Sequence, residues 1–314
     1  MKTTSLGSSG LLGSRLAYGC WRIAGTWHPS EITNERRAQG RAAVRAAYEA
    51  GYTVFDHADI YCDGEAETLF GEVLREISGM RSHILVVTKC GIRKPGEPKA
   101  DSPYRYDFSA DYIVRCCEGS LKRLGLETVD VFLLHRPDYL MDPAEVAGAF
   151  VLLKDAGKVR EFGVSNFRPA QLAALQKACP MPLMANQIEI SLANVTALED
   201  GSLDDCLARG VTPMAWSPLG AGKLGSGAKN LLPSQEKYRT EEVLVVMDRI
   251  AAARGTGRIE VALAWLLRHP ARIMPVVGSV NPENIRAAAR ADTLDLTREE
   301  WYQLFRAARG QALP

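Results

Sequence analysis

Short apolar runs alternate with longer segments of helical period along almost the whole chain. The runs are rich in β-branched and aromatic residues, which is typical of buried strands. They lie at residues 16–20, 53–58, 84–88, 129–134, 161–164, 183–188, 212–216 and 272–277. Eight strands that alternate with helices indicate parallel strands joined by crossovers, which form either a closed barrel or a doubly wound sheet.

The segments between these runs carry helix start and stop signals. Residues 36–50 are rich in Ala and Arg and are followed by Gly51, which is typical of a helix C-terminus. Ser109 is placed to cap the helix that follows it. Thr297, with Glu300 three residues later, predicts a capping box at the start of a C-terminal helix.

The even spacing of the strands favours the barrel over the open sheet. No Pro/Gly-rich linker and no shift in composition divides the chain. We therefore predict an α/β fold of the (β/α)8 TIM-barrel type, in a single domain that spans residues 1–314. The glycine-rich residues 7–13 predict a short N-terminal β-hairpin ahead of the first barrel strand, at the floor of the barrel.

Composition and charge narrow the partners. Hydrophobic residues make up 46% of the chain, and 38 Lys and Arg balance 37 Asp and Glu. We therefore expect no attraction to nucleic acid or to an anionic membrane. The N-terminus lacks a secretory apolar segment, and no run reaches the roughly 18–20 apolar residues of a membrane helix. Seven scattered cysteines without metal-ligand spacing favour reduced thiols, a cytoplasmic location and no metal site.

Polar residues gather at one end of the predicted strands. In a (β/α)8 barrel the active site forms at the C-terminal strand ends. The residues at these ends are Asp56, Tyr61, Lys89, His135, Ser165, Asn166, Gln187, Trp216, Ser217, Gly278 and Ser279. Each of them taken singly is more typical of a structural hydrogen bond. Because seven strands contribute at the same end, together they indicate a functional site.

Four of these side chains suit the protonation of a carbonyl. A tyrosine hydroxyl is a weak acid at neutral pH, and a lysine beside it stabilises the phenolate and lowers its pKa. An aspartate keeps that lysine charged, and a neutral histidine donates to the carbonyl oxygen. Asp56, Tyr61, Lys89 and His135 are the candidates for these roles. Together they form a proton donor for a carbonyl that receives hydride, with no metal required.

Other interpretations of these residues stay open. Asp59 is the alternative carboxylate, but Asp56 directly follows an apolar pair and is favoured as the inward-facing group. His57 is expected to point away from the site. Lys89 also suits the Schiff-base lysine of a barrel lyase, which borohydride trapping with a carbonyl compound would reveal.

Several segments resemble the aldo-keto reductase superfamily, and the resemblance runs from about residue 16 to residue 304. These segments are 51–56 with Tyr61, 88–89, 120–125, 129–130, 134–138, 157–160, 163–167, 186–187, 217–219 and 278–279. Motifs in this order are highly specific. The resemblance is closest to the bacterial NADP-dependent oxidoreductase branch, and it implies a catalytic tetrad of Asp56, Tyr61, Lys89 and His135.

The resemblance also implies how a nicotinamide cofactor is held. Ser165, Asn166 and Gln187 would hydrogen-bond its carboxamide. Trp216 stands where the family stacks an aromatic ring, usually Tyr or Phe, on the nicotinamide. Stacking there leaves one ring face open to the substrate and would fix the stereochemistry of hydride transfer.

The loop after the seventh strand matches a GxGxxG pattern. Residues 220–225 would begin a helix in a Rossmann unit, but the polar segment that follows contains Gly227 and Pro233 and indicates a loop. The resemblance instead implies that this loop covers the cofactor pyrophosphate. The residues assigned to cofactor binding here are Ser217, Pro218, Leu219, Gly220, Gly222 and Lys223, the last as a partner for a phosphate.

The segment after the eighth strand bears on the choice of cofactor. Gly278, Ser279, Asn281 and Asn284 are its predicted binding residues. Family members that prefer NADP usually place basic residues here, whereas Asn281 and Asn284 offer hydrogen bonds without charge. The resemblance implies NADP, and NAD stays an alternative.

The predicted function is NAD(P)H-dependent reduction of aldehydes or ketones to alcohols, with Tyr61 as proton donor. Trp21 and Trp27, just past the first strand, are expected to line the substrate pocket. The partner is a small-molecule carbonyl substrate, and its identity and the oligomeric state stay open. The alternative is a cofactor-binding, redox-sensing regulatory subunit with little turnover, whose feature would be an incomplete tetrad.

Overall fold

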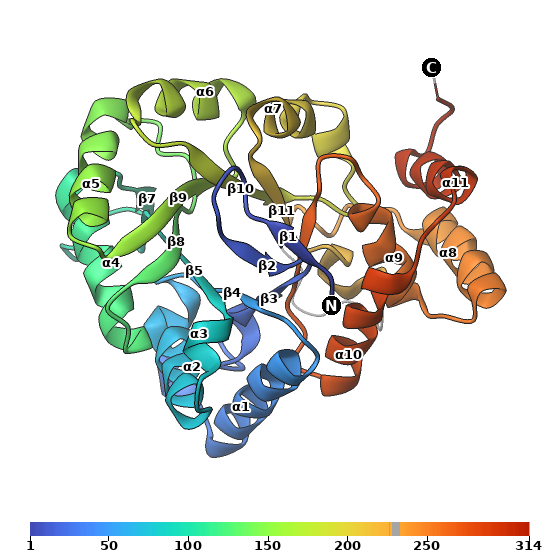
Figure 1. Ribbon diagram of the computed structural model, residues 1–314, viewed down its shortest axis with the longest axis horizontal. Helices are drawn as coiled ribbons and strands as arrows, with labels where there is room; N and C mark the ends of the chain where they lie inside the picture. Colours follow the sequence, from blue (N-terminus) through green and yellow to red (C-terminus); the bar gives the residue numbers. More distant parts are fainter. Residues whose placement is uncertain (226, 228–232, 314) are drawn as a thin grey trace.

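Eight parallel strands close into a barrel in the computed structural model, which describes residues 1–225, 227 and 233–313 (Figure 1). Around the ring they follow the order β3-β4-β5-β8-β9-β10-β11-β12. Their bounds are Ala17–Gly19 (β3), Val54–Asp56 (β4), Leu85–Cys90 (β5), Val129–Leu134 (β8), Val159–Ser165 (β9), Leu183–Glu189 (β10), Thr212–Trp216 (β11) and Met274–Val277 (β12). Each predicted run lies on one of these strands, so the predicted (β/α)8 barrel is confirmed.

Helices surround the barrel as an outer layer (Figure 1). The α-helices are Asn34–Glu49 (α1), Glu65–Glu76 (α2), Met80–His83 (α3), Ala110–Leu124 (α4), Pro143–Asp155 (α5), Pro169–Ala178 (α6), Ser202–Arg209 (α7), Glu241–Arg254 (α8), Arg258–Leu267 (α9), Pro282–Arg290 (α10) and Arg298–Arg309 (α11). The 3-10 helices are Cys20–Arg22 (η1), Pro29–Glu31 (η2), Tyr61–Gly64 (η3), Thr196–Leu198 (η4), Gly220–Gly222 (η5) and Ala291–Thr293 (η6). Within the described ranges, none of the helices has the length and apolar character needed to span a membrane.

Two of the predicted helix signals have different outcomes. Thr297 and Glu300 form the predicted capping box at the start of α11. Ser109 occupies the N-cap position of α4, but its side chain does not cap the helix. Its hydroxyl donates instead to Asp107 Oδ1 at 2.7 Å, because that carboxylate is two residues away and accepts a stronger, charge-assisted bond.

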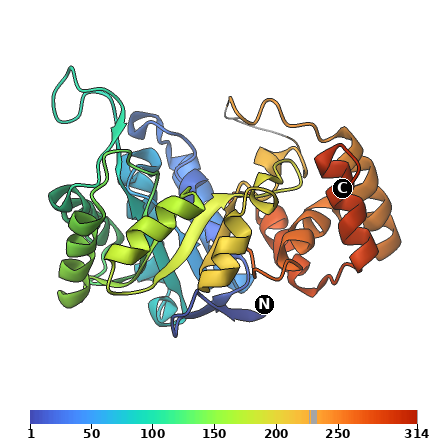
Figure 2. The same cartoon turned by 90° about the horizontal axis from the view of Figure 1, so that it is seen from above.

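The N-terminal hairpin closes one end of the barrel. β1 (Thr3–Ser5) pairs with β2 (Leu12–Ser14) in antiparallel fashion, as predicted. Leu6 and Leu11, from its turn, are buried in a cluster with inward-facing strand residues such as Val54 and Leu133. Figure 2 shows the hairpin at one end of the molecule and the long loops at the other. The opposite, C-terminal end of the strands is therefore the open one.

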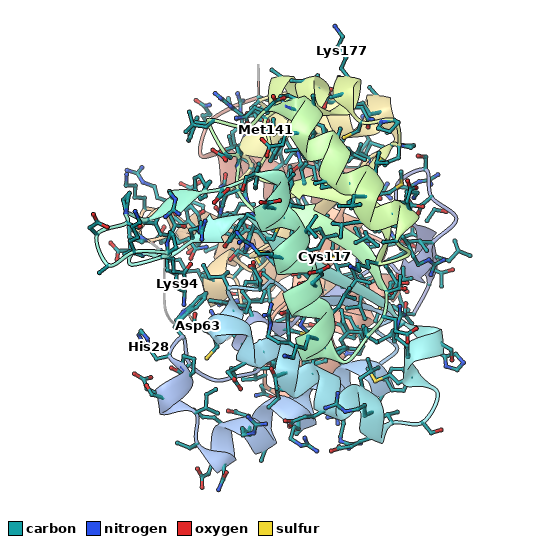
Figure 3. The ribbon with its side chains drawn as sticks, turned by 90° about the vertical axis from the view of Figure 1, so that its left-hand side faces the viewer. His28, Asp63, Lys94, Cys117, Met141 and Lys177 are labelled. Carbon is teal, nitrogen blue, oxygen red and sulfur yellow. The ribbon has the colours of Figure 1, made fainter. Side chains whose placement is uncertain are left out.

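One long loop at this open end forms an arm, residues 94–104, between β6 (Ile92–Arg93) and β7 (Arg105–Tyr106). The two short strands pair antiparallel. Each has only two residues, too few to show the alternation that predicts a strand from sequence. The arm projects from the molecule in Figure 2. Lys94 at its base forms an ion pair with Asp63 of η3, and the two side chains lie next to each other in Figure 3.

Candidate active site

Alternation along the strands explains why polar side chains meet inside the barrel mouth. Successive strand residues point to opposite faces. Val87 lies in the inner cluster of the barrel, and Lys89, two residues later, faces the same way. The same step leads from Val54 to Asp56 and from Leu133 to His135. An apolar layer therefore supports a polar layer directly above it.

Lys89 is the centre of this polar layer. Its side chain is fully buried, and its ammonium donates to Asp56 Oδ2 at 2.8 Å, to the His57 carbonyl oxygen at 2.7 Å and to Tyr61 Oη at 3.0 Å. All three N–H groups of the ammonium are thus used. Burial alone would lower the pKa of Lys89, but Asp56 and Tyr61 outweigh it and raise that pKa above its ordinary value. The lysine stays charged.

Asp56 is held on its other side by a glutamine. Gln187 Nε2 donates to Asp56 Oδ1 at 2.7 Å, so both carboxylate oxygens have a partner. The neighbouring Asp59 forms no ion pair with Lys89, and burial raises the pKa of its carboxyl group well above the ordinary value. His57 packs against Phe70, with ring centroids 4.4 Å apart, and burial lowers its pKa to about 3. Asp56 is therefore the carboxylate that faces the lysine, as predicted.

Tyr61 is presented by a tight turn. It begins η3, in which Cys62 and Asp63 adopt positive φ angles of 47° and 53°. Such left-handed conformations are uncommon for residues other than glycine and persist only where the surroundings enforce them. Here Cys62 is buried, and Asp63 is tied to the arm by the ion pair with Lys94. The turn thus fixes the tyrosine hydroxyl over Lys89.

The acidity of Tyr61 differs from the sequence expectation. Burial raises the pKa of Tyr61 above its ordinary value, while Lys89 pulls it in the opposite direction. The effect of Lys89 has the predicted sign, but burial is the larger of the two. The hydroxyl therefore stays protonated at neutral pH and is available as a hydrogen-bond donor.

His135 completes this group of side chains. Its backbone N–H donates to Cys90 O at 2.8 Å, and its ring meets that of Tyr61 edge to face, with centroids 5.9 Å apart. Burial, reinforced by Lys89 and Arg136, lowers the pKa of His135 well below its ordinary value. The imidazole is neutral at physiological pH. Among the described residues its Nδ1 has no hydrogen-bond partner.

The three residues expected to hold a carboxamide lie beside one another. Ser165 Oγ donates to Gln187 O at 2.8 Å, and Asn166 Nδ2 donates to Ser165 Oγ at 2.8 Å. Asn166 Oδ1 accepts from Trp216 Nε1 at 3.0 Å, which fixes the plane of the indole. Asn166 has a φ of 62°, a left-handed conformation that asparagine tolerates better than most residues.

These groups line one cavity of about 810 Å³ at the barrel mouth. Of the predicted site residues, those on its wall are Asp56, Tyr61, His135, Ser165, Asn166, Gln187, Trp216, Ser217, Pro218, Leu219, Gly222, Gly278, Ser279, Asn281, Asn284, Trp21 and Trp27. The rings of Trp21 and Trp27 lie 5.2 Å apart and form part of this wall. Lys89 lies directly beneath it, bonded to Asp56 and Tyr61.

Two predicted phosphate-loop residues do not line this wall. Lys223 Nζ donates to the carbonyl oxygens of Glu236 and Tyr238, at 3.2 and 3.3 Å, so it fastens the loop to itself. Gly220 is buried, and a side chain there would meet Ala193. Residues 220–222 form only a short 3-10 turn, and the described residues after them, 223–225, 227 and 233–237, are not helical.

Sequence reasoning missed several residues that line the cavity. Gln235 is buried, and its Nε2 donates to Glu189 Oε1 at 3.0 Å and to Ser217 Oγ at 3.1 Å. It lies in a loop without periodicity, so the sequence carried no signal for it. Arg136 also lines the cavity and directly follows His135 in the chain. Its position directly after the candidate residue His135 could have indicated that it lies at the site.

The start of α10 faces the cavity near the predicted cofactor segment. Asn281 Oδ1 accepts from Glu283 N at 2.8 Å and caps the helix, and Asn281 N donates to Ser279 Oγ at 3.1 Å. Both Asn281 and Asn284 line the cavity. A helix N-terminus carries partial positive charge and free N–H groups that favour phosphate. The segment after β12 is therefore suited to an anionic group.

Comparison with known proteins places this geometry in a family. The model of the Aldo/keto reductase family matches residues 15–308. The chain belongs to that family. A 6-dehydroglucose reductase of Agrobacterium fabrum is 40% identical over 299 residues, 95% of each chain. Oxidoreductase YdhF of Escherichia coli is 39% identical over 302 residues, 96% of this chain and 95% of the relative.

Solved structures agree with this assignment. The crystal structure of a thermostable aldo-keto reductase with the inhibitor epalrestat has a TM-score of 0.82 and 25% identity, covering 98% of this chain and 100% of that one. Membership of the aldo/keto reductase family supports carbonyl reduction by an oxidoreductase. Within the ranges 1–225, 227 and 233–313, no cluster of three or more His, Cys, Asp or Glu is arranged to hold a metal ion.

The donor set of this aldo/keto reductase fits a nicotinamide cofactor. A carboxamide offers two N–H donors and one carbonyl acceptor. Gln187 lines the cavity, and its amide nitrogen donates to Asp56. Its Oε1 can therefore accept a hydrogen bond from the amide of the cofactor. Asn166 Oδ1 has a second lone pair beside its bond to Trp216. The Trp216 indole next to these amides supplies an aromatic face.

Proposed function

We propose that the protein reduces aldehydes or ketones to alcohols with NADPH, and that Tyr61 is the proton donor. The observation that carries this proposal is the buried Lys89 ammonium, bonded to Asp56 and Tyr61 beneath a cavity that His135 also lines. A bound reduced nicotinamide would supply the hydride. The carbonyl oxygen would accept a hydrogen bond from the Tyr61 hydroxyl, which transfers its proton as negative charge develops on that oxygen.

Each neighbour of Tyr61 supports this transfer differently. Lys89 stabilises the phenolate that the transfer leaves behind, and Asp56 holds Lys89 in place and charged. His135 is neutral and can donate one hydrogen bond to the same carbonyl oxygen, orienting the substrate. Because the site is buried, these electrostatic interactions are stronger than they would be in water.

This assignment predicts a simple pH profile. The pKa of His135 lies well below its ordinary value, and the pKa of Tyr61 lies above its own. An acid is active while protonated, so kcat/KM for reduction should stay level from about pH 6 to 9 and fall only above about pH 10. Initial rates across this range at saturating NADPH test it. A fall centred near pH 7 would contradict a protonated Tyr61 and a neutral His135.

We further propose that Asn281, Asn284 and the N-terminus of α10 bind the adenosine end of the cofactor. The partial positive charge of the helix N-terminus favours the 2′-phosphate of NADPH. Titration of intrinsic tryptophan fluorescence should therefore show quenching by both cofactors and tighter binding of NADPH than NADH, with Trp216 as the reporter. Tighter binding of NADH would overturn the proposed preference.

A matched variant sharpens this measurement. Asn284→Asp keeps the side-chain size and adds a negative charge beside the proposed phosphate position. Repulsion should weaken NADPH binding by about 10-fold or more, while NADH affinity stays within about threefold. Equal losses for both cofactors would show that Asn284 does not face the 2′ position.

The experiment that tests the function itself is aldehyde-dependent oxidation of NADPH by the purified protein. A panel of aromatic and aliphatic aldehydes and ketones, with the alcohol product quantified by chromatography, should show stoichiometric conversion. Binding of NADPH without any turnover across the panel would favour the redox-sensing regulatory alternative. Trapping of a substrate on Lys89 by borohydride would favour the lyase.

A further inference from the structure

Arg136 is a cation of the active-site cavity without an acidic partner. It follows His135 at the end of β8 and lines the cavity together with Tyr61 and Trp216. Its guanidinium lies over the Trp216 ring, with Cζ 5.4 Å from the ring centroid. Among the described residues it forms no ion pair, and no hydrogen bond of its side chain is present. Arg93, nearby in the fold, has instead an ion pair with Asp107 at 2.6 Å.

The charges on the cavity wall do not balance Arg136. The acidic side chain on the described wall is Asp56, and Lys89 neutralises it at 2.8 Å. The described cavity wall therefore carries the positive charge of Arg136 without an acidic side chain that matches it. The charge of Arg136 adds to the burial that lowers the pKa of His135, and it opposes in part the burial that raises the pKa of Tyr61.

The position of Arg136 in the barrel separates it from the proposed cofactor phosphates. β8 is four strands away from β12 in either direction around the closed ring of eight. The phosphate-binding start of α10 follows β12, so it lies across the barrel mouth from β8 (Figure 1). Arg136 instead adjoins Tyr61 and His135, which hold the reacting carbonyl in the proposed mechanism. Its charge therefore lies on the side of the cavity where the proposed mechanism would hold the substrate.

We propose that Arg136 forms a subsite for an oxyanion, a carboxylate or a phosphate, carried by the carbonyl substrate within a few bonds of its reacting carbon. This inference rests on the proposed reductase function and deepens it. A guanidinium binds such groups through two parallel N–H donors, and its partner here is not supplied by the described protein. The Trp216 face keeps the guanidinium in position by a cation–π contact, and an anion is free to approach its N–H edge.

Matched substrate pairs test this subsite on the intact protein. Succinic semialdehyde and pentanal differ mainly in a carboxylate, and glyceraldehyde 3-phosphate and glyceraldehyde differ in a phosphate. Wild-type kcat/KM should favour the anionic member of at least one pair. In Arg136→Gln that preference should fall by about 10- to 100-fold, mostly through KM, while the neutral members change by less than about threefold.

Two further variants act as controls. Arg136→Lys keeps the charge without the two-donor geometry and should retain part of the preference. Lys177→Gln removes one positive charge from α6, where this exposed side chain points into solvent (Figure 3). It should leave both members of each pair unchanged. Raising the salt concentration should lower the anionic preference of wild type but not that of Arg136→Gln.

The outcomes separate this inference from the function beneath it. The subsite proposal would be overturned if Arg136→Gln affected both members of each pair equally, or if wild type showed no preference for the anionic member. The reductase proposal would stand in that case as long as neutral aldehydes are reduced. Failure of wild type to reduce any member of either pair would overturn the reductase proposal as well. Thermal melting of each variant checks that it is folded. If Arg136→Gln does not fold, the loss of anionic preference is measured with Arg136→Lys instead.

Discussion

Reduction by the Tyr61→Phe variant should be about 10²- to 10⁴-fold slower in kcat/KM than by the wild type, the range that general acid catalysis contributes. The change removes one hydroxyl that is bonded to Lys89 at 3.0 Å. The phenyl ring keeps the packing against His135, so the cavity wall should persist. The measurement is steady-state NADPH oxidation with a neutral aldehyde, combined with fluorescence titration of cofactor affinity, which should stay within about threefold of wild type.

Tyr112→Phe is the matched control for loss of a hydroxyl. Tyr112 lies outside the described cavity wall, and its hydroxyl donates to Ile92 O at 3.1 Å. Its loss should cost about 1 kcal/mol of stability and leave kcat/KM nearly unchanged. If Tyr61→Phe kept wild-type turnover, another group would have to donate the proton. If it lost cofactor affinity as well, Tyr61 would have a structural role.

Lys89→Met should damage stability and activity together. Its ammonium is fully buried and neutralises Asp56, so removing it leaves an uncompensated carboxylate inside the barrel. Breaking a buried pair from one side costs about 3–5 kcal/mol of unfolding free energy. Reduction should also fall by about 10²-fold or more, because nothing then stabilises the phenolate of Tyr61. Denaturant unfolding and steady-state kinetics measure the two effects.

The double variant Asp56→Asn/Lys89→Met separates stability from catalysis. An asparagine at position 56 has no charge to compensate, and its carbonyl oxygen can still accept from Gln187. Most of the lost stability should return, but the activity should not, because the ammonium is still missing. A double variant as active as wild type would contradict the role assigned to Lys89. A single variant as stable as wild type would show that Asp56 takes up a proton without cost.

The barrel and the polar layer at its mouth were predictable because both follow from local patterns. Strand alternation places Lys89 two residues above the apolar Val87, and Asp56 two residues above Val54. These relations lie within single strands, so the sequence contains them. That the strands meet at one end follows from the parallel connections. The predicted neighbours therefore meet, as the 2.8 Å contact of Lys89 with Asp56 shows.

Loop contacts were not predictable, because no period relates their partners. Lys223 was a candidate phosphate ligand because it is a cation in a glycine-rich loop. Its ammonium donates to two backbone carbonyl oxygens, 13 and 15 residues further along the chain. Gln235 reaches the cavity wall from a segment without any pattern. Residues 226 and 228–232 of this predicted pyrophosphate loop lie outside the described residues.

Burial was the second quantity that the sequence did not supply. The spacing placed Lys89 near Tyr61 and indicated a lowered tyrosine pKa. Only the structure shows that the hydroxyl is enclosed deeply enough for burial to outweigh the lysine and raise that pKa. For the same reason, the neutral state of His135 follows from its enclosure beside two cations and not from its place in a motif.

The most direct test of the central claim is to follow deuterium from the cofactor to the product. NADPH carrying deuterium at one or the other of its two C4 positions is incubated with the protein and an aldehyde, and the alcohol is analysed by mass spectrometry. One C4 epimer, and only one, should place a single deuterium on the former carbonyl carbon, because Trp216 covers one face of the nicotinamide in our proposal. Transfer from both epimers, or an alcohol without deuterium, would contradict hydride transfer in this cavity.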